Sequence, residues 1–322
     1  MVSIAMTTFN GEKYIGLQID SILNQTYKDI ELIICDDLST DSTREILLDY
    51  KKKDPRCKIF FNEVNLGFKK NFEKAISLCS GEYIALSDQD DVWELWKIEE
   101  TLKILDDKQF VCTNASLIDE SGNFLGYTMK EVTQYHWMPL DSNSLFKRLV
   151  HGNFVQGSTI LARASFLKTS IPIPLIMPFH DWWFAICACF SNGFAYSKKN
   201  AIRYRQHTSQ VTENKKKTFI NELKATNQDD MTCKKKLSDF EMHVKLCDYL
   251  LAYSSLSETQ TQFLKESRRY FSEMQSKTFY TFLYFAKYCK YISLDKNIFR
   301  NTIRIIKRFL GYFRFKLYKK VA

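Results

Sequence analysis

The first half of the chain alternates between short apolar runs and longer segments of helical periodicity. Four runs rich in β-branched residues predict strands at residues 2–8, 30–35, 58–61 and 83–86. Apolar residues spaced three or four positions apart follow them, as at Ile15, Ile19 and Ile22, and this spacing is typical of a helix with one buried face. Strands that alternate with helices form βαβ units, so we predict an α/β fold with a mainly parallel sheet.

The pattern changes after about residue 110. The sequence DESGN at residues 119–123 lies between two apolar runs and predicts a hairpin turn. A helix is expected at residues 181–191, and after residue 210 the chain is mainly helical, aromatic and basic. We therefore expect two domains, an α/β domain at residues 1–215 and a helical region at residues 216–322.

The composition is that of a globular protein without cross-links. Hydrophobic residues make up 45% of the 322 positions, enough for a large core. The nine cysteines are irregularly spaced, without a CxxC pair or a histidine cluster, so neither a disulfide framework nor a zinc site is indicated. No signal-peptide pattern precedes the first strand, and no stretch reaches the roughly 18 apolar residues of a spanning helix. These features predict a cytoplasmic protein that is soluble or peripheral.

Positive charge is concentrated in residues 296–322. The formal net charge is +9, and this segment holds nine lysines and arginines without an acid, which leaves the rest of the chain formally neutral. A nucleic-acid enzyme would spread positive charge over its working domain, so we expect no nucleic-acid partner. The segment's apolar residues recur at helical spacing: Phe299, Ile303, Ile306, Leu310, Phe313 and Leu317. A basic amphipathic helix of this kind suits an anionic surface at the inner face of the cell membrane, or it packs on the first domain.

Polar residues follow the first two predicted strands. The first strand runs into Thr7-Thr8-Phe9-Asn10-Gly11, and the second ends with Asp36-Asp37. These residue types are common in strand-to-helix turns, where they serve only as caps. Alternatively, they form the floor of a nucleoside site, since a carboxylate there can accept the imide hydrogen of a pyrimidine.

A more specific cluster follows the strand at residues 83–86. Three carboxylates, Asp88, Asp90 and Asp91, stand within four positions of one another. They repel one another at the end of a strand, and a bound divalent cation removes that cost. Mg²⁺ and Mn²⁺ prefer such oxygen ligands and often share them with substrate phosphates. This loop therefore predicts a metal site that binds a phosphorylated substrate.

Two further motifs carry candidate chemistry. His180-Asp181-Trp182-Trp183 lies at the start of the helix expected at residues 181–191, and Arg203-Tyr204-Arg205-Gln206-His207 follows about twenty residues later. An aspartate at the start of a helix is most often an N-cap, but it also serves as a general base in an aromatic cleft. The two tryptophans provide either a surface for sugar stacking or core volume.

These motifs, in this order, resemble family 2 glycosyltransferases with the GT-A fold. The match covers residues 1 to about 210, and the motifs of residues 87–93, 180–183 and 204–207 are similar to those of bacterial rhamnosyltransferases of cell-wall and capsular polysaccharide assembly. The resemblance implies a Rossmann-like, mainly parallel sheet with flanking helices, followed by a C-terminal helical region. It also implies an inverting, metal-dependent transfer of a sugar from a nucleoside-diphosphate donor to a polysaccharide or lipid-linked saccharide acceptor.

The resemblance also implies roles for single residues. The donor nucleotide sugar would contact Thr7, Phe9, Asn10, Asp37, Lys70, Asp88, Gln156 and Gly157. Asp90 would bind Mn²⁺ or Mg²⁺, together with Asp88, Asp91 and His207. Asp181 would deprotonate the acceptor hydroxyl, and Trp182 and Trp183 would contact the acceptor.

The chain departs from the family pattern at two positions. Lys70 stands where many relatives have an arginine, and Leu38 replaces the usual glycine after the paired aspartates. The donor is open between dTDP-rhamnose and a UDP-hexose, and so is the oligomeric state. A catalytically silent polysaccharide-binding module is a different alternative, whereas the first turn lacks the GxGxxG of a dinucleotide-binding oxidoreductase.

Overall fold

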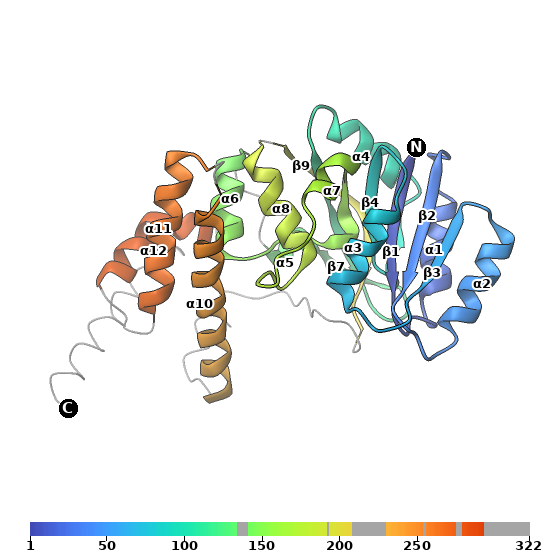
Figure 1. Ribbon diagram of the computed structural model, residues 1–322, viewed down its shortest axis with the longest axis horizontal. Coiled ribbons are helices and arrows are strands. Elements are labelled where there is room, and N and C mark those ends of the chain that lie inside the picture. The colour runs from blue at the N-terminus through green and yellow to red at the C-terminus, as the bar shows by residue number, and fades with distance from the viewer. Residues whose placement is uncertain (134–140, 192, 208–229, 254–255, 275–278, 293–322) are drawn as a thin grey trace. The chain divides into compact units, whose positions relative to one another are not determined.

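The computed structural model describes residues 1–133, 141–191, 193–207, 230–253, 256–274 and 279–292 (Figure 1). The chain divides into two compact units, one of residues 1–132 with 155–216 and one of residues 133–154 with 217–322. The domain boundary expected at residues 215/216 lies outside the described residues. The second unit also contains helix α6 (Ser142–His151), which we had placed in the first domain.

The first unit is built on a nine-stranded sheet in the order β3-β2-β1-β4-β8-β6-β9-β5, with β7 paired to β6. Strands β3, β2, β1 and β4 run parallel to one another, whereas β8, which lies between β4 and β6, is antiparallel to both. The hairpin expected at residues 119–123 joins β6 to β7. The strands are β1 (Val2–Thr8), β2 (Ile30–Asp36), β3 (Cys57–Phe61), β4 (Tyr83–Ser87), β5 (Val92–Trp93), β6 (Phe110–Ile118), β7 (Phe124–Thr128), β8 (Ile160–Arg163) and β9 (Phe194–Arg205).

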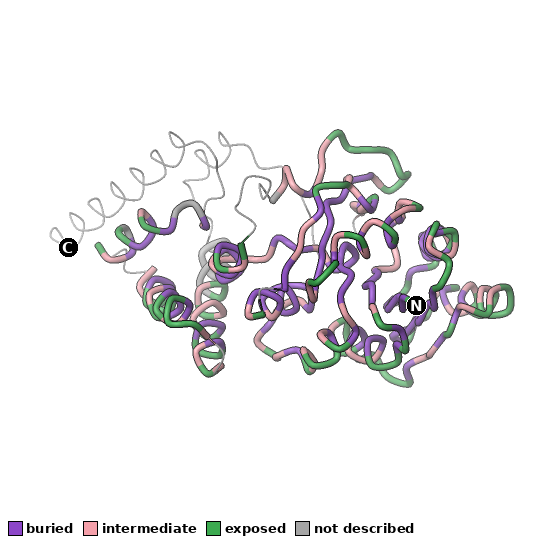
Figure 2. Tube along the Cα trace, turned by 90° about the horizontal axis from the view of Figure 1, so that it is seen from above, coloured by how far each residue is buried: buried purple, intermediate pink, exposed green. Residues whose placement is uncertain are grey.

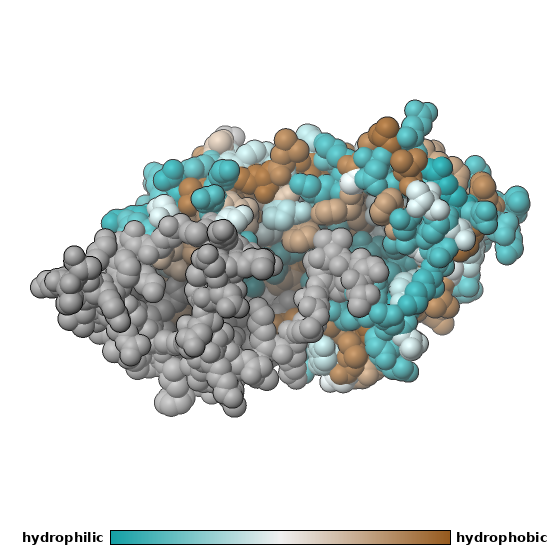
Figure 3. Space-filling model, turned by 90° about the horizontal axis from the view of Figure 1, so that it is seen from below, coloured by the Kyte–Doolittle hydropathy of each residue, from teal (hydrophilic) through white to brown (hydrophobic). Residues whose placement is uncertain are grey.

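Helices flank this sheet. Every residue of β1 and β2 is buried, which explains why their sequences are continuous apolar runs and do not alternate. Figure 2 shows the buried strands inside and exposed residues on the outer sides of the helices, and Figure 3 shows hydrophobic patches scattered among hydrophilic residues on one face. The helices are α1 (Ile15–Leu23), α2 (Thr43–Lys53), α3 (Phe68–Leu78), α4 (Lys97–Leu105), α5 (Met129–Thr133), α7 (Ala164–Thr169) and α8 (His180–Phe190), with a 3₁₀ turn at Gly157–Thr159.

The carboxyl ends of three parallel strands meet at one edge of the sheet. Thr8 of β1 pairs with Asp36 of β2, and Met6 pairs with Ser87 of β4. The turns that follow these strands carry Phe9, Asp37 and the acidic loop of residues 88–91. Ligands of open α/β sheets lie at this edge, so the fold places the predicted donor residues together.

The described part of the second unit is helical. It consists of α6, α10 (Asp230–Leu251), α11 (Glu258–Glu273) and α12 (Phe279–Ile292). Tyr284 lies at its centre, where its hydroxyl contacts His151 Nε2 at 3.0 Å and Ser267 Oγ at 2.5 Å. None of the described helices is long and apolar enough to cross a bilayer. The α/β fold with a helical C-terminal region is thus confirmed, and the basic segment of residues 296–322 lies outside the described residues.

Candidate active site

The acidic loop meets the last strand of the sheet at a carboxylate–imidazole pair. Asp90 Oδ2 and His207 Nε2 lie 2.8 Å apart, and the two side chains are 20% and 11% exposed. The His207 ring also lies against the ring of Tyr14, with 5.3 Å between centroids. One oxygen and one nitrogen donor are therefore held side by side near the surface. Two of the four predicted metal ligands, Asp90 and His207, are thus in direct contact.

Arg205 holds the acidic loop in place. Its side chain is buried; Nε donates to Asp90 O at 2.8 Å, and its backbone N–H donates to Asp91 Oδ1 at 3.0 Å. Nη1 donates to Glu120 O at 3.0 Å, and the guanidinium lies 4.5 Å from the ring centroid of Tyr14. Sequence reasoning quoted Arg205 but gave it no role. The sequence shows only that an arginine stands two residues before a candidate ligand, and neither its burial nor its partners can be read from that spacing.

Asp91 is less accessible than Asp90, whereas Asp88 is half-buried like Asp90. Asp91 is 1% exposed, and burial, helped by Asp90, raises its pKa to about 7 although Ser158 and Arg205 oppose the shift. Burial also raises the pKa of Asp88 well above its usual range, with further contributions from Asp90, Asp91 and Asp181. The predicted mutual repulsion is therefore present. Asp91 is buried and its Oδ1 accepts a hydrogen bond from Arg205 N, a position that does not favour contact with an ion. Its role as a metal ligand stays a prediction.

A buried lysine lies beneath the acidic loop. Lys97, the first residue of α4, is fully buried, and its Nζ lies 3.4 Å from the ring centroid of Trp93. Burial lowers the pKa of Lys97 well below its usual range, while Asp91 acts to raise it. Among the residues that the structure describes, Lys97 Nζ has no hydrogen-bond partner. Sequence reasoning missed this residue.

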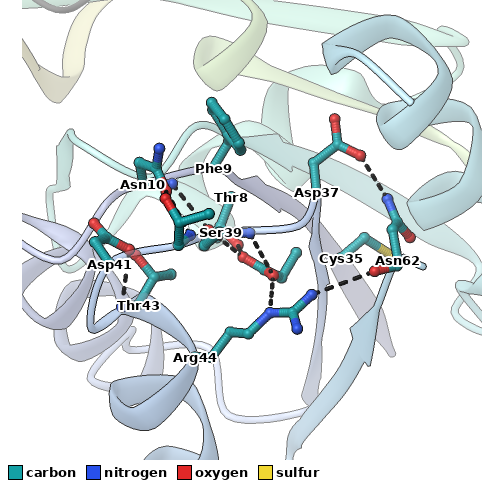
Figure 4. A network of polar contacts seen from close by, with 12 residues as sticks. Thr8, Phe9, Asn10, Cys35, Asp37, Ser39, Asp41, Thr43, Arg44 and Asn62 are labelled. Carbon is teal, nitrogen blue, oxygen red and sulfur yellow. Dashed lines mark hydrogen bonds and ion pairs between the residues drawn. The ribbon is translucent and has the colours of Figure 1, made fainter. Parts of the chain in front are cut away.

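Asp37, expected at the nucleobase, supports the loop before α3. Its Oδ1 accepts hydrogen bonds from Asn62 Nδ2 and Leu66 N, and its Oδ2 accepts one from Gly67 N, all at 2.8 Å. Figure 4 shows the carboxylate directed at Asn62. A carboxylate offers about four acceptor sites, so this side chain, only 3% exposed, has little capacity left. A contact with the base stays a prediction.

The neighbouring Asp36 is a second support that sequence reasoning missed. It is fully buried and accepts hydrogen bonds from Thr8 Oγ1 at 3.1 Å, Ser39 N at 3.1 Å and Arg44 Nε at 2.9 Å. These contacts tie the end of β1 to the turn after β2. The polar residues at these two strand ends thus have a structural role in joining the turns, and the nucleoside floor stays a prediction.

Phe9 and Asn10 form the rim of this floor. The Phe9 side chain is 47% exposed, whereas Thr7 is buried at 9%. Asn10 has a positive φ of 49°, and its Oδ1 accepts a hydrogen bond from Thr40 N at 2.8 Å. Phe9 and Asn10 are therefore exposed at this edge of the sheet, whereas Thr7 is buried.

Lys70, expected at the diphosphate, is bound elsewhere. Its Nζ forms an ion pair with Glu73 Oε2 at 2.7 Å, and the lysine side chain is 50% exposed. The adjacent Lys69 reaches Met177 O at 2.8 Å and so joins α3 to the segment before α8. The diphosphate role of Lys70 stays a prediction, and it requires the lysine to leave Glu73.

Asp181 lies in the first turn of α8 but is not its N-cap. The N-cap is Phe179, and Asp181 Oδ1 accepts a hydrogen bond from Trp182 N at 2.6 Å. The Asp181 carboxylate acts electrostatically on Asp88 and on Cys112. The structure thus brings the predicted base within electrostatic reach of the acidic loop, about ninety residues away in sequence.

The turn containing Gln156 and Gly157 lies against the residue before Asp181. A Cβ atom at position 157 would lie 2.6 Å from His180 Nε2, so only glycine fits there. His180 is buried and stacks on Phe72 with 4.0 Å between centroids. Burial lowers the pKa of His180 to about 3, so the imidazole is neutral. Gly157 thereby allows close packing beside the base, and its proximity to the donor sugar stays a prediction.

The predicted acceptor surface at Trp182 and Trp183 needs correction. The two side chains are 4% and 2% exposed, and Trp183 Nε1 donates to Ser170 O at 2.7 Å. Both rings belong to the first turn of α8 and are buried in the core of the first unit. They therefore provide core volume and not an open stacking surface.

Comparison with known proteins identifies the family. The family model for glycosyl transferase family 2 matches residues 3–170, more than half of the chain. The chain belongs to glycosyltransferase family 2. The acidic loop, the Gly157 turn and the three parallel strand ends all lie inside the matched residues.

Individual relatives match parts of the chain. An uncharacterized glycosyltransferase of Haemophilus influenzae is 31% identical over 170 residues, which cover 51% of this chain and 52% of that protein. The Escherichia coli protein WfgD, a UDP-Glc:alpha-D-GlcNAc-diphosphoundecaprenol beta-1,3-glucosyltransferase, is 38% identical over 105 residues, 33% of this chain and 41% of WfgD. The chain thus spans about half the length of these curated relatives.

The fold has a solved counterpart. A crystal structure of S. aureus TarS, residues 1–349, in complex with UDP-GlcNAc superposes with a TM-score of 0.59 over 100% of this chain and 92% of that one. The sequence identity is 17%, so this likeness establishes the fold alone.

Proposed function

We propose that this glycosyltransferase is an inverting, metal-dependent enzyme that moves a sugar from a nucleoside-diphosphate donor to a hydroxyl of a polysaccharide or lipid-linked saccharide. The observation that carries the proposal is the pair formed by Asp90 and His207, 2.8 Å apart at the donor edge of the sheet. Asp181 acts electrostatically on the same acidic loop. This arrangement supports a donor-side ion site and a proton acceptor within the same unit.

The residues present fit Mn²⁺ or Mg²⁺. Carboxylate oxygen and imidazole nitrogen are suitable donors for Mn²⁺, and such ions commonly keep water and substrate phosphate oxygens as further ligands. Among the described residues, no three His, Cys, Asp or Glu side chains converge into a metal cage. A bound ion would neutralise charge on the departing diphosphate. Asp90 and His207 would hold it, with Arg205 fixing the Asp90 backbone.

Asp181 would act on the acceptor. Its carboxylate would accept the proton of the acceptor hydroxyl, whose oxygen then attacks the anomeric carbon from the side opposite the leaving diphosphate. The bond to the diphosphate breaks as the new glycosidic bond forms, so the anomeric configuration inverts. Asp181 and Asp88 repel each other electrostatically. A cation bound at the acidic loop before transfer would offset this repulsion.

The donor sugar has two candidates. The resemblance to rhamnosyltransferases at residues 87–93 and 180–183 supports dTDP-rhamnose as our first choice. A UDP-hexose is the second, and it is supported by the UDP-Glc donor in the name of WfgD and the UDP-GlcNAc bound to TarS. The diphosphoundecaprenol acceptor of WfgD supports a lipid-linked acceptor, which an enzyme docked peripherally on the cytoplasmic membrane face would reach.

A screen of nucleotide sugars tests the proposal. We expect the purified protein to release nucleoside diphosphate from one donor in the presence of Mn²⁺, and EDTA to stop the release. An Asp90→Ala variant should be inactive, whereas Asn24→Ala, on the exposed surface of the turn after α1, should match the wild type. Donor binding without turnover of any donor or acceptor would instead favour the catalytically silent binding module.

A further inference from the structure

The Gln89 side chain joins two loops that would contact opposite ends of the donor. Phe9 N donates to Gln89 Oε1 at 2.8 Å, and Gln89 Nε2 donates to Phe9 O at 3.0 Å. One side-chain amide therefore satisfies both polar backbone groups of a residue 80 positions away. Gln89 itself lies between Asp88 and Asp90, whereas Phe9 is the first residue after β1.

Gly11 makes room for this pairing. A Cβ atom at position 11 would overlap Gln89 Oε1 and would lie 2.6 Å from Gln89 Cδ. Gly11 N donates to Thr43 Oγ1 at 2.8 Å, which fixes the backbone against the start of α2. An alanine at this position would therefore push the Gln89 amide away from Phe9. Gly11 lies outside the left-handed φ region, so the need for glycine comes from this close approach.

We propose that Gln89 is a positioning residue that couples occupation of the metal–diphosphate side of the donor site to binding of the nucleoside. The inference rests on the proposed function, in which Asp90 holds the ion, and on the contact between Phe9 and the donor nucleotide that the family resemblance implies. Arg205 holds this loop in the absence of an ion, but repulsion among Asp88, Asp90 and Asp91 opposes that conformation, and a bound ion would remove the opposition. Once the loop is fixed, the amide of Gln89 fixes the Phe9 turn, so the nucleoside binds to an ordered surface at a lower entropic cost.

The coupling can be measured with separate fragments of the donor. A nucleoside, uridine or thymidine, carries no phosphate and cannot contact the ion directly. Its dissociation constant is measured by calorimetry or ligand-observed NMR on the full chain, with and without saturating Mn²⁺ and inorganic pyrophosphate. We expect Mn²⁺–pyrophosphate to tighten nucleoside binding about fivefold or more in the wild type, within the usual range of coupling between two sites.

Two substitutions should remove this coupling by different routes. Gln89→Ala deletes the amide, and Gly11→Ala displaces it, so each should bring the ratio of the two dissociation constants close to one. The double variant should lose no more coupling than either single variant, since both act on the same contact. Asn24→Ala removes a side-chain amide that bonds only locally, to Asp20 O at 2.9 Å, and should keep the wild-type ratio.

The outcomes separate this inference from the proposed function. Retention of the coupling in Gln89→Ala, with an unchanged melting temperature, would overturn the inference, and so would a wild type whose nucleoside affinity ignores Mn²⁺–pyrophosphate. In both cases Mn²⁺-dependent release of nucleoside diphosphate by the wild type would leave the proposed function intact. Absence of any metal-dependent turnover would count against the proposed function itself.

Discussion

The imidazole of His207 and the carboxylate of Asp90 lie 2.8 Å apart although 117 positions separate them in the sequence. If they share a metal ion, loss of either one weakens metal binding. We expect Asp90→Ala to abolish transfer and His207→Ala to raise the Mn²⁺ concentration needed for half-maximal activity more than tenfold. Activity measured across a Mn²⁺ titration checks this.

Lys13→Ala is the control for that titration. Lys13 forms an exposed ion pair with Glu120 at 2.8 Å, near the same loops but without contact to Asp90. Its Mn²⁺ dependence should match the wild type. Full activity of Asp90→Ala, or of the wild type in EDTA, would contradict the proposed metal site.

Asp181 should affect the chemical step and not donor binding. Asp181→Asn keeps the shape of the side chain and an acceptor for Trp182 N but removes the proton acceptor. We expect turnover to fall about 10²-fold or more while donor affinity stays nearly unchanged. Steady-state kinetics and calorimetry with the nucleoside diphosphate separate the two effects. A parallel loss of affinity and turnover would indicate a role in folding of the helix start.

The sequence predicted the strand ends well, because every residue of β1 and β2 is buried and continuous apolar runs mark such strands. It did not predict the partners of the two adjacent aspartates. Asp36 accepts a hydrogen bond from Arg44 and Asp37 accepts one from Asn62, and only the three-dimensional packing distinguishes the two. The role of Arg205 was likewise out of reach. Its partners Asp90 and Glu120 come from loops whose contact depends on the whole sheet.

The tryptophans illustrate a different difficulty. Aromatic side chains beside a candidate base suit both a sugar surface and a core, and the pattern of residues 180–183 alone does not separate the two. The structure buries Trp183 against Ser170, a residue of the segment after α7. Burial of this kind depends on tertiary packing, which local sequence does not encode.

Lys97 and Asp91 should be energetically coupled. Lys97 is fully buried under the acidic loop, and Asp91 is the charged group that acts on it. Burial lowers the pKa of Lys97 and raises the pKa of Asp91 to about 7, so Lys97→Met should destabilise the protein above pH 7, where the buried Asp91 carboxylate is ionised and has lost this partner. The double variant Lys97→Met/Asp91→Asn should recover about 1–3 kcal/mol of the summed loss, as measured by urea unfolding in a double-mutant cycle. Simple additivity of the two single variants would show that the groups do not interact.

Glu31 should make the first unit sensitive to acid. Burial alone would raise its pKa, but hydrogen bonds from Lys58, Ser3 and Ser80 outweigh burial and lower the pKa to about 2. Because the folded-state pKa is depressed, the stabilisation is present above the unfolded value near 4.5 and is lost as pH falls towards 2. At full strength the shift corresponds to about 3 kcal/mol, and solvent screening at the half-exposed Lys58 reduces this contribution.

Urea unfolding at pH 6 and pH 3 checks this contribution. Glu31→Gln should lower stability at pH 6 and should lose less stability than the wild type between the two pH values. Glu45→Gln, on the exposed face of α2, is the control and should follow the wild type. Identical pH dependence of Glu31→Gln and the wild type would contradict the prediction.

The basic segment of residues 296–322 should bind anionic membranes, a prediction that rests on its sequence. Each lysine or arginine near an anionic surface contributes about 1 kcal/mol. Replacing Arg304, Lys307 and Arg308 with glutamine should therefore weaken binding to phosphatidylserine-containing vesicles about 100-fold at low salt, and added salt should weaken the wild type in the same direction. Glutamine at Lys51, Lys52 and Lys53, three exposed lysines at the end of α2, removes the same charge and should leave binding nearly unchanged. Equal weakening of vesicle binding by both triple variants would mean that binding depends only on the net charge of the protein. Unchanged vesicle binding of the first variant would favour packing of the segment on the enzyme.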